Sequence, residues 1–477
     1  MHNRFSPPTL GSFLVVMHGV SSQAGIMSRR WHVCIALALI AVAPATGRVV
    51  AQTVQAQPLV ASTDNSQALT LEQALRRALE TNPTLRSQRQ AHNVAAADIV
   101  IARTYPFNPS WENRIQQASG PASAGITNAV PVEELVLLEL EIRGQGKYRR
   151  EVASAALSRT DWTIAAQEQA LAVAVVRAFD ALLYQQEKVR LLERVLVLDQ
   201  QLVTDVSRLF QARTVEVMLA QTEVDNARAA LAIGRANVIT AQATLRTALG
   251  AVGKNFTATG TLDLPPQTLD LAALTQQALE RRPDLRALQS ALAEADATLQ
   301  LTIADRFGNP VIGPAFTYDP TRVSSIGAQI NIPLPVLNTH RGAILKQQAM
   351  RCQALLNLQQ TQLTVRQEVE AAVEHLRAAQ TRATMYRTSI LPHLEQVLQD
   401  VHKLYLENAK GADLLKIVDV QRSLGTAQAA YLDTLYEASQ ARAELFAATG
   451  GMPVVPSVVE PSETPEVLPP IAPNHAR

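Results

Sequence analysis

The residues of this chain that come closest to a catalytic motif are Gly144-Gln145-Gly146-Lys147. A phosphate-binding loop requires Gly-x4-Gly-Lys followed by Ser or Thr, because backbone N–H groups must surround the phosphates while the hydroxyl reaches a magnesium ion. Here the glycines are too close together, and Tyr148 follows the lysine. The sequence also lacks His-Glu-x-x-His, Gly-x-Ser-x-Gly and any Cys/His cluster. It therefore favours a protein that is not an enzyme and uses no cofactor.

A metal site is not expected either. His340 has no histidine or glutamate partner at helical spacing, and a lone histidine is more often structural or exposed than a metal ligand. The chain has 2 cysteines, Cys34 and Cys352, and Cys34 lies in a segment that we expect to be removed. This excludes a zinc site of several cysteines and a disulfide within the mature chain.

The composition is that of long helices rather than of a large globular core. Aromatic residues make up 4% of the 477 residues, and alanine, leucine, glutamine, arginine and glutamate are abundant. The 43 basic and 42 acidic residues are well mixed and leave a net charge of +1. A general nucleic-acid-binding surface is therefore not expected, and charges at helical spacing indicate a solvated face.

Residues 1–51 have the pattern of a secretory signal peptide region. Arg29 and Arg30 precede an apolar run over 33–42, and small residues at 43–45 and 49–51 offer cleavage sites. The apolar run is too short to span a membrane as a helix. We therefore expect the chain to leave the cytoplasm.

Three details refine this expectation. Met27 stands just before the basic pair, so residues 1–26 are a possible upstream extension. Cys34 lacks the neighbours of a lipid-modified cysteine, so no lipid anchor is expected. Residues 52–68 are polar, and we expect them to be flexible.

One pattern occurs twice, 200 residues apart. The identical pairs are Leu71/Leu271, Ala78/Ala278, Leu79/Leu279, Glu80/Glu280, Pro83/Pro283, Leu85/Leu285 and Arg86/Arg286. We predict an internal duplication with a first repeat at 69–250, a linker at 251–268 and a second repeat at 269–450. The tail at 451–477 is rich in proline, has no apolar periodicity and is expected to be disordered.

Long helices are expected in both repeats, because proline and glycine are absent from long stretches in which apolar residues recur at helical spacing. The expected helices are residues 71–80, 83–103, 147–210 and 216–249 in the first repeat, and 270–280, 283–305, 342–408 and 413–449 in the second. Apolar residues recur every seven positions, as in coiled coils, at Leu182, Val189, Leu196, Val203 and Phe210. Roughly 65 helical residues would extend about 100 Å, so each repeat should form a long antiparallel hairpin.

Strands are expected within 105–142, around a loop near 118–127, and at 310–319 and 324–336. From Ile326 to Val336 every even residue is apolar, and the odd residues are Gly, Gln, Asn and Pro. This alternation fits the wall of a membrane barrel, although a half-buried soluble sheet would show it too. About four strands per chain are too few to close a barrel, since the smallest have about eight. Several chains would then share one barrel, because open edges are not tolerated in lipid.

These features together resemble the TolC-type outer-membrane factor family over roughly residues 69–450. The resemblance rests on the doubled Ala-Leu-Glu-x-x-Pro-x-Leu-Arg, on Pro-Leu-Pro-Val-Leu-Asn-x-x-Arg-Gly-Ala at 333–343, and on the stretch 411–424 that ends in Asp-Val-Gln-Arg-Ser-Leu. The stretch 333–343 looks most like the metal-efflux branch, whose members serve cobalt-zinc-cadmium or copper-silver pumps.

The resemblance implies a mainly α-helical chain with a small β part that assembles as a homotrimer. In the family, long antiparallel α-helical hairpins form an α-barrel across the periplasm, and four β-strands per chain contribute to a 12-stranded outer-membrane β-barrel. A periplasmic adaptor (membrane fusion) protein and an inner-membrane RND-type pump dock at the periplasmic end. We therefore expect an outer-membrane exit duct that exports substrates passively, with heavy-metal cations as the cargo.

In the family, acidic residues on the return helix of the second hairpin narrow the periplasmic mouth. Asp419 falls on the inner acidic position, whereas Lys416, one helical turn earlier, departs from the family pattern; Asp413 precedes them both. Threefold symmetry would place rings of Asp419 and Lys416 one turn apart. These rings could pair and close the mouth, or form a constriction that is less selective for cations. The alternative is that both side chains simply face solvent.

Two further sets of residues follow from the resemblance. The hairpin tips are the expected adaptor contacts, at Arg213, Thr214, Val215, Lys410, Gly411 and Ala412. Gly411 is expected to adopt a backbone conformation that other residues avoid. The alternative is that both tips are plain turns. The expected lining of the barrel lumen is Glu139 and Glu141, opposite Gln329 and Asn331.

Other functions stay open on the sequence alone. A duct of the same family for drug efflux or type I secretion would look alike, because the duct is largely indifferent to its cargo. A soluble periplasmic coiled-coil adaptor or scaffold would share the signal and the hairpins, but it would carry a lipoyl-like domain that this sequence does not show. A filamentous protein would not have strand pairs interrupting its heptads at matching places.

Overall fold

The structure of the protein, a computed structural model, describes residues 67–121, 123, 130–208, 214–263, 269–406 and 414–451. The predicted signal region, all but the end of the segment 52–68, and the tail after 451 lie outside the described residues. The same holds for 209–213 and 407–413, which include most of the predicted hairpin tips. The described residues all belong to one compact unit.

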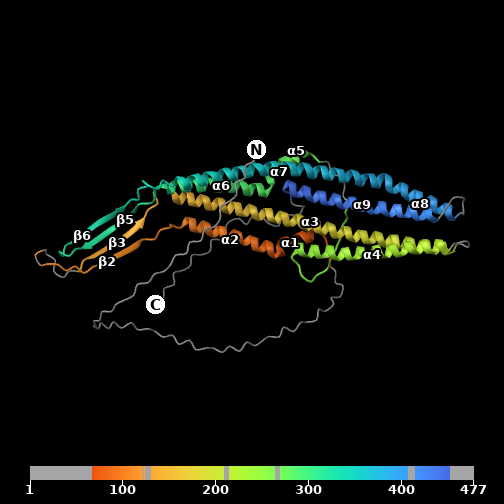
Figure 1. Ribbon diagram of the computed structural model, residues 1–477, viewed down its shortest axis with the longest axis horizontal. Coiled ribbons are helices and arrows are strands. Elements are labelled where there is room, and N and C mark those ends of the chain that lie inside the picture. Colours follow the sequence, from red (N-terminus) through yellow and green to blue (C-terminus); the bar gives the residue numbers. More distant parts are fainter. Residues whose placement is uncertain are drawn as a thin grey trace, which may run out of the picture. The chain divides into compact units, whose positions relative to one another are not determined.

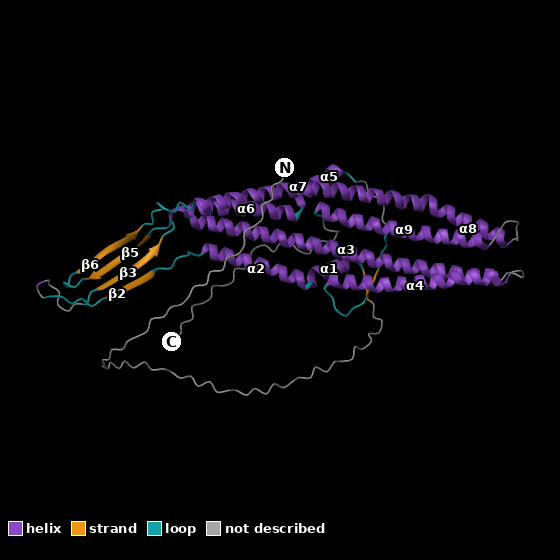
Figure 2. Cartoon of the chain, viewed as in Figure 1, coloured by secondary structure: helices purple, strands orange, loops and turns teal. Residues whose placement is uncertain are grey.

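Each repeat contributes two shorter helices followed by long ones (Figures 1 and 2). The first repeat has α1 (Leu71–Thr81), α2 (Pro83–Arg103), α3 (Gln145–Arg208) and α4 (Thr214–Leu249). The second has α5 (Leu271–Arg281), α6 (Pro283–Ala304), α7 (Arg341–Met385), α8 (Leu391–Leu406) and α9 (Leu414–Thr449). The mainly α-helical fold with long antiparallel hairpins is confirmed. None of these helices combines the length and the apolar character needed to cross a membrane.

The helices form a layer in which the others pack along two long ones, α3 and α7. Both α2 and α4 pack against α3, and both α6 and α9 contact α3 as well as α7. Figure 1 shows α2 and α4 in succession along one side of α3, and α6 and α9 in succession along the other. The layer therefore has two different edges, one formed by α2 and α4 and the other by α7.

Caps start the shorter helices close to where the sequence predicted them. Thr70 Oγ1 accepts a hydrogen bond from the Gln73 backbone N–H at 3.4 Å, and the Gln73 side chain accepts one from the Thr70 N–H at 3.2 Å. In the second repeat, the Asp270 carboxylate accepts from two N–H groups of α5. Pro83 and Pro283 open α2 and α6, where the missing N–H costs no helical hydrogen bond.

The end of each return helix meets the start of a shorter helix through the same contact in both repeats. Asn82 Nδ2 donates to the carbonyl oxygen of Ala248 at 3.1 Å, where α4 ends and α2 begins. At positions 200 residues later, Arg282 Nη1 donates to the carbonyl oxygen of Ala448 at 3.3 Å, where α9 ends and α6 begins. These side chains satisfy terminal carbonyl groups that have no partner inside their helix.

A glycine completes each of these joints. Gly250 has a φ of 63° and Gly450 a φ of 73°, in the left-handed region that favours glycine. A Cβ at position 250 would lie 2.7 Å from Pro83 Cδ, and one at position 450 would lie 3.0 Å from the Arg282 backbone. Both the backbone conformation and the close approach of the next helix therefore require glycine.

A small parallel sheet covers the largest buried cluster of the first repeat. Its strands are β1 (Gln67–Leu69) and β4 (Phe256–Ala258). Phe256 is fully buried, and it packs with α3 and α4 residues such as Leu182 and Leu245. Neither strand was predicted from the sequence, because a strand of 3 residues is too short to show a period.

The larger sheet is antiparallel and joins the two repeats. Its strand order is β2 (Ser110–Ile115), β3 (Val132–Glu139), β5 (Val311–Tyr318) and β6 (Ser324–Asn331). Strands from both repeats were predicted in these places. The last strand, however, ends at Asn331 rather than at 336, because Pro333 and Pro335 have no N–H to donate to a neighbouring strand.

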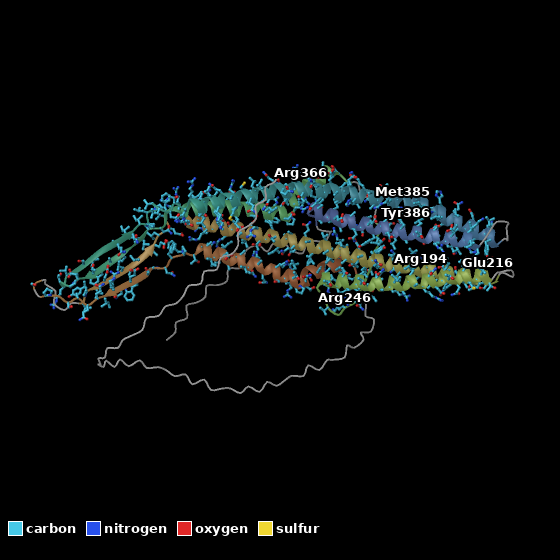
Figure 3. The ribbon with its side chains drawn as sticks, in the orientation of Figure 1. Arg194, Glu216, Arg246, Arg366, Met385 and Tyr386 are labelled. Carbon is cyan, nitrogen blue, oxygen red and sulfur yellow. The ribbon has the colours of Figure 1, made fainter. Side chains whose placement is uncertain are left out.

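The helix predicted at 342–408 is not continuous. After α7 ends at Met385, Tyr386–Ile390 form a turn of π-helix, and α8 then begins at Leu391 (Figure 3). Pro392 has no N–H for the carbonyl group four residues earlier, and a π-type turn accommodates the loss of that hydrogen bond.

The seven-residue apolar repeat along α3 matches the observed burial only in part. Leu182 is buried, whereas Val189, Leu196 and Val203 are half-buried; Phe210 lies outside the described residues. Other apolar residues of this stretch are more deeply buried, namely Leu191, Leu202 and Val206. Because α3 packs against both α4 and α9, its buried residues face two helices. They do not form the single seam of a two-stranded coiled coil.

We predict that Gly450→Ala lowers the free energy of unfolding by about 1–3 kcal/mol, because alanine would hold a left-handed φ against a neighbouring backbone. Heat-induced loss of helical circular dichroism in detergent measures the effect. The matched control is Gly342→Ala, where an added Cβ meets nothing within 4 Å. Equal melting temperatures for the two variants would contradict this account of the joint.

Candidate functional site

The four-stranded sheet has one face that is largely apolar and exposed. Residues directly opposite each other on antiparallel strands lie on the same face, and the register places Trp111, Val136 and Ala328 together. The large exposed hydrophobic residues on this face are Trp111, Ile115, Val136, Ile312, Phe316, Ile326 and Ile330. Such a contiguous apolar surface indicates contact with lipid or with another protein surface.

The opposite face of the sheet is mainly polar. It carries Glu112, Arg114, Glu133, Glu139, Gln329 and Asn331 beside small residues. Three apolar residues share this face: Leu135 and Leu137, which are buried, and Val311. Arg114 Nη1 donates to Glu133 Oε2 at 2.9 Å across two strands. Polar residues therefore predominate on this face and large apolar residues on the other, as the alternation along β6 predicted. The apolar face also holds a polar pair, in which Glu134 Oε1 accepts from Asn113 Nδ2 at 3.4 Å.

Three of the four residues predicted to line a lumen share the polar face. Glu139 lies opposite Val311, which lies opposite Asn331, so Glu139 and Asn331 belong to one row. Gln329 is on the same face of β6. Glu141 is not in this group, because β3 ends at Glu139 and the Glu141 carboxylate forms an ion pair with Arg149 of α3.

The segment that resembled a phosphate loop belongs to the junction between sheet and helices. Gln145 is 1% exposed, and its Nε2 donates to Asn309 Oδ1 at 2.6 Å. Asn309 Nδ2 in turn donates to Glu139 Oε1 at 3.0 Å. Tyr105 Oη donates to the Glu139 carbonyl oxygen at 2.6 Å. The junction thus has a connected polar network, which no motif in the sequence revealed.

The far ends of the hairpins hold the residues predicted to form the constriction. Lys416 and Asp419 are exposed on α9, and the two residues between them, Ile417 and Val418, are buried. The pair therefore lies three positions apart on the exposed side of this helix, and the two rings stay a prediction. Asp413, Arg213, Lys410, Gly411 and Ala412 lie outside the described residues. Thr214 and Val215 are exposed at the start of α4.

A charged cluster that the sequence did not single out lies where the two hairpins meet. Arg422 Nη2 of α9 donates to Glu223 Oε1 of α4 at 2.7 Å. Asp199 of α3 lies nearby, and burial together with the Glu223 charge raises the pKa of Asp199 to about 6. The three residues come from helices far apart in sequence, so only the fold brings them together.

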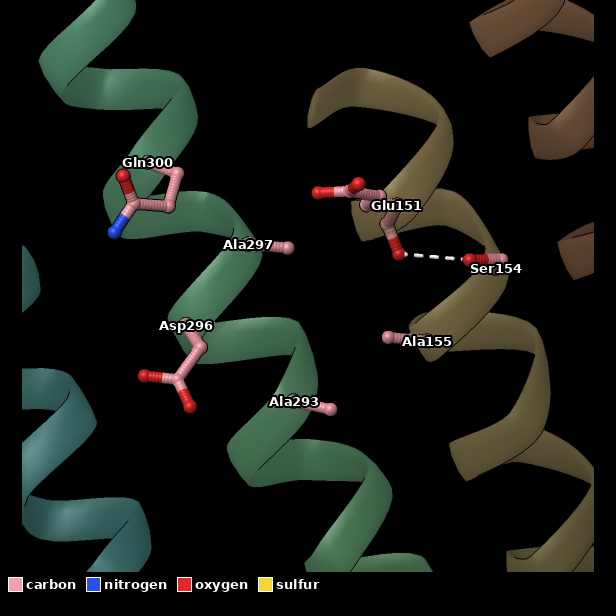
Figure 4. A pocket seen from close by; sticks show the side chains of 7 residues that line it. All are labelled: Glu151, Ser154, Ala155, Ala293, Asp296, Ala297 and Gln300. Atoms are coloured by element: carbon pink, nitrogen blue, oxygen red, sulfur yellow. Dashed lines mark hydrogen bonds between the residues drawn. The ribbon is translucent and has the colours of Figure 1, made fainter. Parts of the chain in front are cut away.

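A groove lies between α3 and α6. About 450 Å³ in volume, it is lined by Glu151, Ser154, Ala155, Ala293, Asp296, Ala297 and Gln300 (Figure 4). Ser154 Oγ donates to the Glu151 carbonyl of its own helix at 2.9 Å, and Asp296 forms an ion pair with Arg351. Ser154 and Asp296 are therefore engaged within the chain, and we assign the groove no ligand. No group of metal-binding side chains is found among the described residues.

Several solved outer-membrane channels have the same fold. CusC is 19% identical, with a TM-score of 0.65 over 80% of this chain and 92% of CusC. The Campylobacter jejuni CmeC outer membrane channel is 14% identical, with a TM-score of 0.64 over 80% and 85% of the two chains. The Neisseria gonorrhoeae MtrE outer membrane channel, in its open state, is 19% identical, with a TM-score of 0.63 over 80% and 89%. At such identities the likeness establishes the fold.

Sequence comparison adds no family assignment. No protein-family model matches the chain, and no curated protein matches it.

We predict that Asp199→Asn stabilises the fold above about pH 6 by about 1 kcal/mol, a value that allows for solvent screening of a half-exposed carboxylate. The folded state binds more protons than the unfolded chain between pH 3.8 and about 6, so the wild type loses stability as the pH rises through this window. Asparagine does not ionise, so the variant keeps the stability that the wild type loses in this pH range.

Melting temperatures at about pH 4 and about pH 8 measure the difference. The control is Asp225→Asn, since Asp225 is exposed and paired with Arg228. A gain for Asp199→Asn that is the same at both pH values would contradict the assigned cause.

Proposed function

We propose that the protein is the outer-membrane exit duct of a tripartite efflux system, formed by three copies of the chain. The two-faced sheet carries the proposal. Its apolar face suits lipid, and its polar face, with Glu139, Gln329 and Asn331, suits a water-filled lumen. A soluble periplasmic adaptor or scaffold, the alternative, would have no use for so large an exposed apolar face. The fold shared with CusC, CmeC and MtrE supports the same conclusion.

The open edges of the sheet support the assembly. β2 and β6 each have one side without a partner strand among the described residues. Unpaired backbone groups are not tolerated in lipid, so the edge formed by β2 of one copy would pair with β6 of the next. Three copies with four strands each give twelve, an even number within the range of outer-membrane barrels.

The edges of the helical layer support the same ring. The helices at both edges carry exposed apolar side chains. They are Val94, Val100, Ile101, Ile233 and Ile239 on α2 and α4, and Leu345, Leu356, Leu363 and Met385 on α7. The two edges differ, so contact between copies would be head-to-tail, and such contacts close into a ring when the rotation permits. The helices would then enclose a tube that continues the barrel across the periplasm.

The proposal also includes partner proteins, a constriction at the periplasmic end of the duct, and a cargo. We place a periplasmic adaptor protein and an inner-membrane RND-type pump at the hairpin ends, with Lys416 and Asp419 at the constriction. The duct itself is not an enzyme and exports passively. We propose heavy-metal cations as the cargo, on the strength of the stretch 333–343. A deletion strain sensitised to metal salts supports this cargo, whereas one sensitised to drugs, or defective in protein secretion, favours the alternatives.

We predict that Ile330→Arg lowers the stability of the membrane-inserted protein by about 2–4 kcal/mol if position 330 lies near the bilayer midplane, because a charge would face lipid. The matched control is Gln329→Arg on the neighbouring position of β6, which faces the polar side. Unfolding in urea from lipid vesicles measures the difference. Equal losses at the two positions would refute the assignment of the faces.

We predict that Asp419→Ala changes single-channel conductance and ion selectivity in planar bilayers while the trimer stays folded. Loss of the carboxylate ring would remove the charge that favours cations at the mouth. Asp225→Ala, a change at an exposed residue of α4, is the control and should leave both quantities unchanged. Conductance and selectivity like those of the wild type would refute the ring assignment.

A further inference from the structure

A cavity of about 370 Å³ lies where the two hairpins meet. Its walls come from α3 and α4 of the first repeat and from α8 and α9 of the second. Leu192, Val195 and Leu398 give it a largely apolar lining. Ligand pockets commonly have volumes of about 300–1,000 Å³ with apolar walls and a few polar groups. This cavity falls within that description.

Small residues keep the cavity open. Ala230 of α4 and Gly425 of α9 line it from opposite hairpins. A Cβ added at Gly425 would meet Val195 Cγ2 at 3.8 Å, which is ordinary contact distance, so a larger side chain would fit there at its base and extend into the space. The cavity is therefore a product of residue size rather than of an unusual backbone.

The polar groups in the lining leave one negative charge without a partner. Arg422 Nη2 donates to Glu223 Oε1 at 2.7 Å, and Lys188 Nζ donates to Tyr184 Oη at 2.7 Å. Asp199 forms no ion pair with a cation of the described residues, and the charge that acts on it is that of Glu223. An unpaired carboxylate beside apolar walls favours a cationic ligand.

A second group in the lining lacks a hydrogen-bond donor. Gln421 lines the cavity, and its Oε1 is buried without a partner. A buried acceptor that is left without a donor destabilises the folded chain. A ligand that brings both a positive charge and N–H donors would serve Asp199 and Gln421 together. Its apolar body would also fill the apolar part of the cavity, which a bare metal cation would leave empty.

We propose that this cavity binds an organic ammonium ion, with a compact apolar body between the hairpins and its protonated amine directed to Asp199. A cavity of about 150 Å³ is enough for benzene, so 370 Å³ accommodates a larger cage or bicyclic body. Because the walls come from both repeats, the ligand would contact both hairpins at once. The proposal stands independently of the efflux function.

The charges around Asp199 give the site a pH dependence. The charged groups that line the cavity are Lys188 from α3, Glu223 from α4 and Arg422 from α9, while α8 contributes the apolar Leu398. The pKa of Asp199 is raised to about 6 by burial and by the Glu223 charge. Asp199 is therefore ionised at about pH 8 and mostly protonated at about pH 5, where binding of the ammonium ion should be about tenfold weaker.

The test is isothermal titration of the full-length assembled protein in detergent with adamantan-1-amine. Adamantane-1-carboxylate is the ligand control, since it has the same apolar body and the opposite charge. We expect saturable binding of the amine with one site per chain, about tenfold weaker at about pH 5 than at about pH 8, and no measurable binding of the carboxylate. Equal affinity for both ligands would overturn the proposal, because it would indicate partition of the apolar body alone.

Amino-acid substitutions test whether the amine binds in this cavity and at Asp199. Asp199→Asn should weaken amine binding at least tenfold at about pH 8 and remove the pH dependence, whereas Asp225→Asn, also on the first hairpin, should leave binding unchanged. Gly425→Leu should abolish binding by filling the cavity. Amine binding that is the same in Asp199→Asn as in Asp225→Asn would overturn the assignment, whether or not Gly425→Leu folds. Channel conductance is not involved, so the outcome does not depend on the duct proposal.

Discussion

A sheet of four strands with one apolar face cannot exist alone in water or in lipid, and this constraint organises the rest of the molecule. β2 and β6 leave backbone groups unpaired at the two edges of the described sheet. The exposed apolar face, which includes Trp111 and Ile330, also has to be covered by lipid or by another protein surface. In the proposed barrel, pairing of edge with edge between copies would satisfy the backbone groups, and lipid would cover the apolar face. Assembly would then be a condition for the sheet rather than an addition to it.

In the helical layer, the joint that occurs in both repeats connects helices end to end. Asn82 and Gly250 hold α2 and α4 end to end, and Arg282 and Gly450 hold α6 and α9 in the same way. Two helices in line therefore accompany α3 on each side, so the layer continues from the sheet to the hairpin ends. One edge of this layer is formed by α2 and α4 and the other by α7, and two different edges are what the proposed head-to-tail ring requires.

Local sequence patterns predicted the long helices and the strands of the larger sheet. The features that were not predicted depend on contacts between residues far apart in the sequence. Pro83 and Pro283 marked helix starts, and the even-numbered apolar residues after Ile326 marked one sheet face. Strands β1 and β4 escaped prediction because each is only 3 residues long and is held by partners far away in sequence. For the site, Glu139 and Asn331 share one face of the sheet, and their place in a lumen stays a prediction. Glu141 does not share that face, because β3 ends at Glu139 and the Glu141 carboxylate pairs with Arg149. The cluster around Asp199 has no sequence signature, since three separate helices supply it.

The central claim is that three copies share one membrane barrel, and the most direct test is the size of the species extracted from the outer-membrane fraction in mild detergent. Native mass spectrometry, with gel mobility before and after heating, gives both the stoichiometry and its dependence on the fold. We expect an outer-membrane trimer that dissociates to a single chain only on heating. A monomer recovered from the soluble periplasmic fraction would contradict it, because the open sheet edges would then have no partner and the apolar face no lipid.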